Sequence, residues 1–139
     1  MFERQVEYYN RKYQLTWDEN GFLLNPGPVP GNAWDAKVFR DVVLTIIGTG
    51  NIKVYGSAQA EPPKFEDPST LENTWTPIAL VDYSLVGAPA YFDGATGITV
   101  TNETKLAELD TNGLTWFAIK RTVTEGNVVD VLATVFTAV

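Results

Sequence analysis

Two stretches near the C-terminus, LTWFAIKR at residues 114–121 and VVDVLATVF at residues 128–136, decide the fold. Apolar residues recur in both at every second position. Side chains of a β-strand point to alternate faces of a sheet, so this period gives each stretch a face to bury. The sequence TEGN at residues 124–127 separates them, and Gly126 can adopt the positive φ that a tight turn needs. The pattern predicts a β-hairpin that packs on further strands.

Apolar stretches of the same kind fill the chain upstream of this pair. They cover residues 34–47, 52–57, 75–81, 90–92 and 97–101, after which Leu106 and Leu109 lead toward the last pair. Short strands at regular intervals, with no helical period after residue 24, are typical of sandwiches and jelly rolls. We therefore predict an all-β fold, an antiparallel, jelly-roll-like β-sandwich of about eight strands with an N-terminal arm that is extended or partly helical.

Glycine, proline and polar residues mark the expected strand ends. The sequence NG at residues 112–113 is a second hairpin signal, and GTGN at residues 48–51 predicts a turn between two strands. Pro77 cannot donate a hydrogen bond to a neighbouring strand, which places its strand at a sheet edge or bulge. Arg40 and Asp41 indicate a bend or bulge within a long apolar stretch.

The first 24 residues are set apart by their aromatic content. Phe2, Val6, Tyr9 and Tyr13 follow a helical spacing, whereas the alternation from Tyr13 to Trp17 indicates a strand. The sequence NG at residues 20–21 would turn that strand back on itself as a small hairpin. The aromatic rings either cover an edge of the chain's own sandwich or contact another subunit, and both alternatives are open.

A proline-rich stretch, NPGPVPGN at residues 25–32, follows the arm. Three prolines remove backbone donors and favour an extended, semi-rigid path, so this stretch reads as a linker. We predict an N-terminal arm and linker over residues 1–31 and a β-sandwich body over residues 32–139.

Composition excludes several classes of function. The chain has 139 residues, no cysteine and no histidine, which removes disulfides, thiolate nucleophiles, Ser–His–Asp triads and His-bearing zinc sites. The net charge of −7 disfavours binding to a nucleic acid backbone. No run approaches the roughly 20 apolar residues of a membrane span, and the N-terminus lacks the pattern of a signal peptide. We expect neither nucleic acid nor membrane as a partner.

Carboxylates are the one plausible catalytic machinery that remains. Asp82 and Asp93 flank a Gly- and Pro-bearing stretch, and one long loop, from residue 58 to about residue 74, holds four further acids: Glu61, Glu66, Asp67 and Glu72. None of them has the spacing signature of a glycosidase pair or of a calcium loop. We interpret them as solvated loop residues and expect no catalytic residue, no metal and no cofactor.

The four tryptophans provide an alternative binding function. Trp17, Trp34, Trp75 and Trp116 could form a platform on which sugars stack, as in a carbohydrate-binding module. Trp116 lies between Leu114 and Ala118 in a strand pattern that favours a core position. The other three lie near strand starts or linkers, where either role is open.

The body also resembles a known class of proteins. The residues that carry the resemblance are FRDVVLT at 39–45, GTGNIKVYGS at 48–57, NTW at 73–75, GATGI at 94–98 and NGLTWF at 112–117. Over about residues 36–137 this pattern is similar to the small β-sandwich structural proteins of tailed-phage virions, and particularly to capsid decoration, or cement, proteins.

The resemblance implies a non-enzymatic scaffolding role. Cement proteins of this kind sit as trimers on a capsid and bridge neighbouring capsomers. It therefore implies the major capsid protein and copies of this chain, in a homotrimer, as partners, and a place on the capsid surface of a virion made in the host cytoplasm. A tail, neck or fibre component is an open alternative within the same class. The partner-contact residues expected in the arm are Phe2, Tyr8, Tyr9, Tyr13 and Trp17.

Overall fold

A computed structural model describes residues 4–9, 15–27, 31–83, 90–111 and 113–138. These residues form nine β-strands and no helix, so the all-β prediction is confirmed. Within them, no helix is long and apolar enough to cross a membrane.

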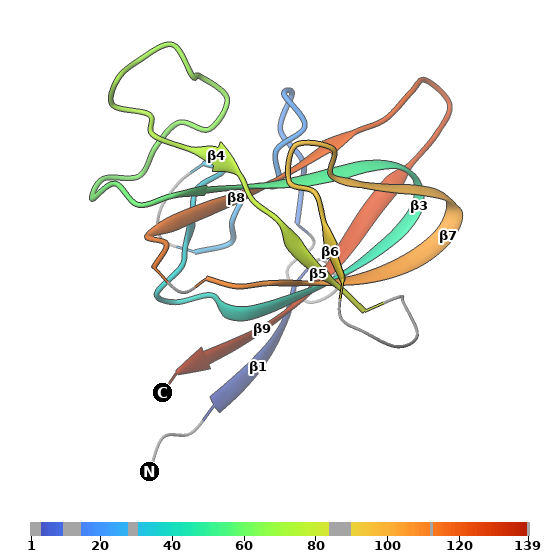
Figure 1. The fold of residues 1–139 in the computed structure, drawn as a ribbon, viewed down its shortest axis with the longest axis horizontal. Helices are drawn as coiled ribbons and strands as arrows, with labels where there is room; N and C mark the ends of the chain where they lie inside the picture. The colour runs from blue at the N-terminus through green and yellow to red at the C-terminus, as the bar shows by residue number, and fades with distance from the viewer. Residues whose placement is uncertain (1–3, 10–14, 28–30, 84–89, 112, 139) are drawn as a thin grey trace.

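All strand pairs are antiparallel, and they connect into one sheet in which β3 is central (Figure 1). The strands are β1 (Arg4–Tyr9), β2 (Trp34–Asp35), β3 (Arg40–Ser57), β4 (Thr76–Pro77), β5 (Leu80–Asp82), β6 (Ala90–Phe92), β7 (Ile98–Leu109), β8 (Trp116–Thr122) and β9 (Val129–Ala138). The main path runs β1-β9-β3-β7-β5-β6, while β2 pairs with β8, and β4 and β8 pair with β3. The described strands are thus joined in one sheet, whereas the predicted sandwich has two.

β3 runs unbroken through residues 48–51, so the predicted turn there is wrong. The strand instead shifts register between Gly48 and Gly50. A Cβ at Gly48 would lie 2.2 Å from the backbone oxygen of Val128, and Gly48 has a φ of 116°. Glycine at this position therefore lets two backbones approach closely and bends β3 without ending it. The bulge predicted near Asp41 is confirmed, because the register shifts there and Asp41 has a φ of 48°.

β8 and β9 do not form the predicted hairpin. Residues 51–57 of β3 pair with β8, and the earlier part of β3 pairs with β9. β7 pairs with both parts of β3, and must therefore lie on the opposite edge from β8 and β9. β8 and β9 follow one another along the same edge, and the loop between them leaves the sheet and returns. Gly126 has the expected positive φ of 86°, but the turn that it serves does not pair its two flanking strands.

The hairpin predicted from residues 112–113 is wrong for the same reason. β7 and β8 lie on opposite edges of β3, so the chain crosses over between them. Gly113 has a positive φ of 81°, as the turn signal predicts, and Asn112 lies outside the described residues. Pro77 occupies the short edge strand β4, which confirms its predicted place at an edge.

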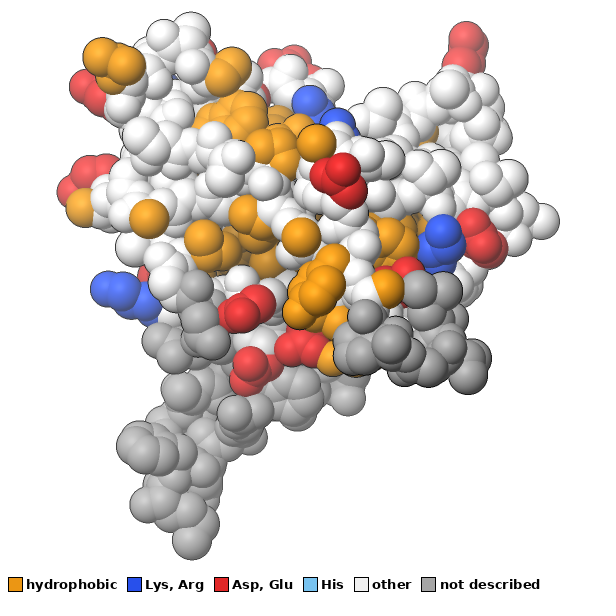
Figure 2. All heavy atoms as spheres, viewed as in Figure 1, with side chains coloured by type: hydrophobic (Ala, Val, Ile, Leu, Met, Phe, Trp, Pro, Cys, Tyr) orange, Lys and Arg blue, Asp and Glu red, His pale blue; other side chains and the backbone are white. Residues whose placement is uncertain are grey.

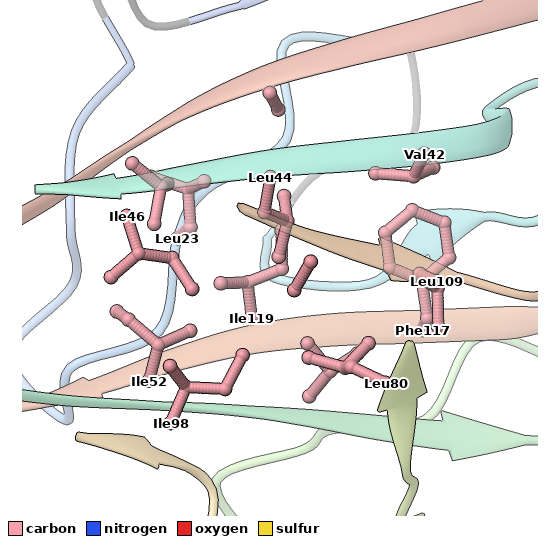
Figure 3. Packing of buried hydrophobic residues seen from close by; sticks show 14 of the residues in the cluster. Leu23, Val42, Leu44, Ile46, Ile52, Leu80, Ile98, Leu109, Phe117 and Ile119 are labelled. Carbon is pink, nitrogen blue, oxygen red and sulfur yellow. The ribbon is translucent and has the colours of Figure 1, made fainter. Parts of the chain in front are cut away.

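The core lies on the inner face of the bent sheet. Val42, Leu44 and Ile46 from the first half of β3 are buried, and so are Ile52 and Val54 from its second half. Figure 3 shows side chains from the first half of β3 directed toward those of Ile52, Ile98 and Leu80. The period of two predicted from the sequence therefore continues across the bulge.

A second apolar cluster covers the outer face of β3 and β8. It joins Tyr55 of β3 and Trp116 of β8 to Phe65, which lies in the loop at residues 58–75 and is 1% exposed. Phe22, Ala33 and Ala118 complete the buried cluster, and Trp75 packs against it. The acids of this loop are predicted to be solvated, and they lie at the surface. Pro63 and Phe65 turn inward, so the loop is also a packed cover.

The N-terminal region is extended where the structure describes it. β1 pairs with β9, which excludes a helix over Arg4–Tyr9. The predicted hairpin is present, with Trp17 bridged to Leu23. Phe22 and Leu23 are buried among residues of the body, so this end of the predicted arm packs as part of it.

The proline-rich stretch closes into a loop. The Asn25 side-chain amide donates to the carbonyl oxygen of Ala33 at 2.6 Å, and the Asn25 backbone N–H donates to that of Gly31 at 3.1 Å. Residues 28–30 lie outside the described part. The two described ends of the predicted linker are thus held together.

Candidate partner-binding surface

Of the five predicted partner-contact residues, the structure describes Tyr8, Tyr9 and Trp17, which belong to two different elements. Phe2 and Tyr13 lie outside the described residues. Tyr8 and Tyr9 belong to β1, where their backbones lie opposite Thr134 and Ala133 of β9. Trp17 lies in the small hairpin, which runs beside β8.

Trp17 is held by its own chain. The Arg121 guanidinium lies 4.6 Å from the centre of its ring, and its indole N–H donates to the Asp130 carboxylate at 3.4 Å. The same carboxylate oxygen accepts the backbone N–H of Val131 at 2.9 Å. Trp17 therefore spans the point where β8 ends and β9 begins, and it packs against the core. Trp17 therefore fits the alternative in which an aromatic ring of the arm covers the chain's own sheet.

The hairpin that carries Trp17 is fixed by local hydrogen bonds. One Asp18 carboxylate oxygen accepts the backbone N–H groups of Asn20 and Phe22, each at 2.9 Å. Gly21 has a φ of 89°, and a Cβ there would lie 2.5 Å from the carbonyl oxygen of Arg121. The Arg121 N–H in turn donates to Gly21 at 2.8 Å. The NG signal at residues 20–21 thus correctly predicts the turn, which lies against β8.

Three of the candidate catalytic acids, Asp93, Glu66 and Asp67, accept hydrogen bonds within loops. An Asp93 carboxylate oxygen accepts the backbone N–H of Ala95 at 2.8 Å. Glu66 accepts a hydrogen bond from the Asn32 side chain at 2.7 Å. Hydrogen bonds from the hydroxyl and the backbone N–H of Ser69 lower the pKa of Asp67. Among the described residues, no three acids come together in a way that could hold a metal ion.

The four tryptophans do not form a sugar-binding platform. Trp34 is fully buried, and its indole N–H donates to the carbonyl oxygen of Leu23 at 3.1 Å. Trp116 is 8% exposed, which confirms its expected core position. Trp75 packs edge-on against Tyr55, with ring centres 4.8 Å apart. Because the rings are buried or covered by neighbours, they cannot form an exposed row for sugar stacking.

An uncovered surface lies instead on the outer face of the first half of β3. Residues that pair across antiparallel strands share a face, so the register defines which side chains lie there. We call this surface the open face. Its members form three rows across β6, β5, β7, β3 and β9: Tyr91, Val81, Glu108, Val43 and Thr134; then Tyr83, Leu106, Thr45 and Leu132; then Thr104, Ile47 and Asp130.

Four large side chains of the open face are well exposed. Ile47 and Leu106 are each 42% exposed, Tyr83 is 52% exposed and Tyr91 is 70% exposed. In Figure 2, hydrophobic side chains reach the surface where β5 and β6 lie in Figure 1, and acidic side chains border them. Large exposed apolar groups on one surface are typical of sites that contact another molecule.

The charged side chains of the open face are all acidic. Glu108 and Asp130 are its two ionisable acids, and the three rows contain no lysine or arginine. The Tyr83 hydroxyl donates to the Glu108 carboxylate, and the Tyr83 backbone N–H donates to Leu106 at 3.1 Å. These two bonds hold the exposed ring on the sheet.

Sequence reasoning did not identify the open face as a binding surface. The signal that could have found it is the run from Val42 to Ile47, which is apolar on both faces of one strand. A strand with a single buried face would alternate with polar residues. The second apolar face of β3 indicates a cover, and the described part of the chain supplies one only over Tyr55 and its neighbours.

Comparison with known proteins identifies a shared fold. No family model matches the chain, and no curated protein matches it. A solved structure does match: the crystal structure of SPBc2 prophage-derived protein YomS aligns with a TM-score of 0.54 and 13% sequence identity. The alignment covers 99% of this chain and 96% of that one. At this identity the likeness is one of fold.

Proposed function

We propose that this chain is a non-enzymatic structural protein of a phage particle, which binds the capsid shell as a decoration protein and bridges neighbouring capsomers. The observation that carries the proposal is the match, nearly end to end, with the fold of a prophage-derived protein. The partners in this proposal are the major capsid protein and further copies of the chain in a homotrimer. Its place is the capsid surface of a virion made in the host cytoplasm.

The chemistry of the described residues supports a binding role. Three of the acids considered for a hydrolase, Glu66, Asp67 and Asp93, accept hydrogen bonds from loop backbone and amide groups. The open face, in contrast, presents aliphatic and aromatic side chains beside acids, a combination suited to contact with another protein.

The arm contributes through β1 in this proposal. Among the described strands, β1 pairs with β9 alone, and Figure 1 shows the two projecting from the body toward the chain ends. An edge strand can add a strand from another chain through backbone hydrogen bonds. Phe2, Tyr8, Tyr9 and Tyr13 remain proposed contact residues, while Trp17 is engaged with its own body.

Sedimentation with separated virion parts tests the proposal. Particles made without this chain would be divided into capsid shells and tails, and the purified full-length chain would be added to each. We expect the chain to sediment with shells and to stay in the supernatant with tails. Binding to tails alone would assign it to the tail, and binding to neither would refute a structural role in the particle.

Light scattering on the full chain tests the homotrimer. The chain has a mass of 15.3 kDa, and we expect three times that value in solution. A monomeric mass at all concentrations would contradict a preformed trimer and would leave assembly to the capsid.

A further inference from the structure

We propose that the open face docks onto a positively charged, partly apolar protein surface of the particle, and that it does not pair with a second copy of this chain. The inference rests on the proposed function and names the surface and the partner chemistry of the same contact. Its basis is the exposure, register and charge of the three rows defined above.

Exposure shows that the open face is built as a contact surface. In the second half of β3, Phe65 and Trp75 cover Tyr55, the aromatic side chain on its outer face. In the first half, Ile47 and Leu106, which lies in the adjacent row on β7, are each 42% exposed. Covering these side chains would remove apolar area from water, which favours association.

The open face is too small to hold a symmetric dimer together by itself. With strands about 4.8 Å apart and side chains of one face about 6.8 Å apart along each strand, the twelve positions of the three rows span roughly 400 Å². A stable interface buries about 800 Å² on each partner. The open face therefore suits one contact of a protein that is also held elsewhere, as on the surface of a large particle.

The acids of the open face also disfavour a symmetric dimer. Two copies joined through this face would bring Glu108 and Asp130 against the same acids, in chains that each carry a net charge of −7. Like charges that face one another are destabilising and suppress the wrong partner. Lysine or arginine side chains on the partner would instead meet these two acids at opposite sides of the apolar rows.

A charge-sign experiment at Thr104 tests the partner chemistry. Thr104 is exposed and lies in the row with Ile47 and Asp130, so its substitution adds charge without removing an apolar contact. The full-length chain would be titrated onto particles made without it, and binding would be measured by sedimentation. We expect Thr104→Lys to weaken binding about fivefold and Thr104→Glu to keep or tighten it. Rising salt should shrink the difference between the two.

Matched controls lie in the covering loop. Thr70 is also exposed, and Thr70→Lys and Thr70→Glu should both bind like the unmodified chain. For the apolar part, Leu106→Ser should weaken binding about tenfold, whereas Leu71→Ser should have no effect although Leu71 is fully exposed. Light scattering on every variant would report self-association.

Each outcome separates the two proposals. Binding by the unmodified chain that Thr104 and Leu106 variants leave unchanged would overturn the open face as the contact and would leave the proposed function standing. A chain that does not bind particles at all would refute both. Self-association that Leu106→Ser abolishes and Thr104→Lys strengthens would show that a second copy is the occupant.

Discussion

The outer face of β3 is covered at Tyr55 in the second half of the strand and open at Ile47 in the first half. In the second half, Tyr55 lies under Phe65 and Trp75, which the chain supplies from its own loop. In the first half, Ile47 lies exposed on the same side of the strand. In the proposal above, the open half is the part of this face that contacts another molecule.

Phe65→Ala should have the largest effect on stability. The side chain is 1% exposed and fills the space between the covering loop and the sheet. Its removal should lower the free energy of unfolding by about 3–5 kcal/mol. Urea unfolding followed by tryptophan fluorescence would measure the loss. A loss below about 1 kcal/mol would mean that the loop is not a structural cover.

Gly48→Ala should come next, because Gly48 lies where the two halves of β3 meet. The new Cβ would lie 2.2 Å from the Val128 oxygen, at a φ of 116°. We expect a loss of about 2–3 kcal/mol in the free energy of unfolding. Gly126→Ala is the control, since it adds the strain of a positive φ with no atom within 4 Å of the new Cβ. Equal losses in the two variants would contradict a close backbone approach at Gly48.

Asn73→Ala should loosen the covering loop. The Asn73 side chain accepts the Lys64 N–H at 2.8 Å and donates to the Asp67 carbonyl oxygen at 2.6 Å. Losing both bonds should cost about 1–3 kcal/mol in the free energy of unfolding. Hydrogen exchange should accelerate in the loop and leave β7 and β9 unchanged. Acceleration across the whole sheet would show that the loop is not a separate cover.

Ile47→Ala should barely change stability. Because the side chain is 42% exposed, we expect a change within about 0.5–1 kcal/mol in the same urea experiment. A cost as large as that of Phe65→Ala would show that Ile47 is packed by its own chain, and the contrast between the halves would fail.

Asp67→Asn should have the smallest effect, which is a change in how the free energy of unfolding depends on pH. Ser69 lowers the pKa of Asp67 in the folded chain, so the ionised carboxylate favours folding above its ordinary pKa. That contribution should be lost as the pH falls through the lowered folded value. Asp67→Asn should remove this small part of the acid dependence of urea unfolding, and an unchanged profile would show that the Ser69 contact has no energetic weight.

The sequence located several strands, because strand formation is largely a local property, but it missed the full lengths of β3 and β7. A period of two located β6 and the buried positions on both sides of the bulge in β3. The residues of β8 and β9 were located too, but their pairing was not. Gly126 indicates locally that the chain turns. The strand with which β9 then pairs is β3, which lies some 80 residues away in the sequence, so the local pattern does not indicate it.

The candidate site was harder to predict for a related reason. Phe65 is an isolated apolar residue in a polar loop, and nothing local shows that it packs on Tyr55. The apolar residues on both faces of β3 indicate that two faces need cover. Which half receives it is settled by where the loop at residues 58–75 folds back, and that is a property of the tertiary structure.

The absence of cysteine allows the most direct test of the open face. Single cysteines at Thr104, on the open face, and at Thr70, on the covering loop, would each be labelled with a maleimide in the free chain and on particles. We predict that particle binding slows labelling at position 104 at least about tenfold and leaves position 70 unchanged. Unchanged labelling at position 104 on particles that hold the chain would contradict the account.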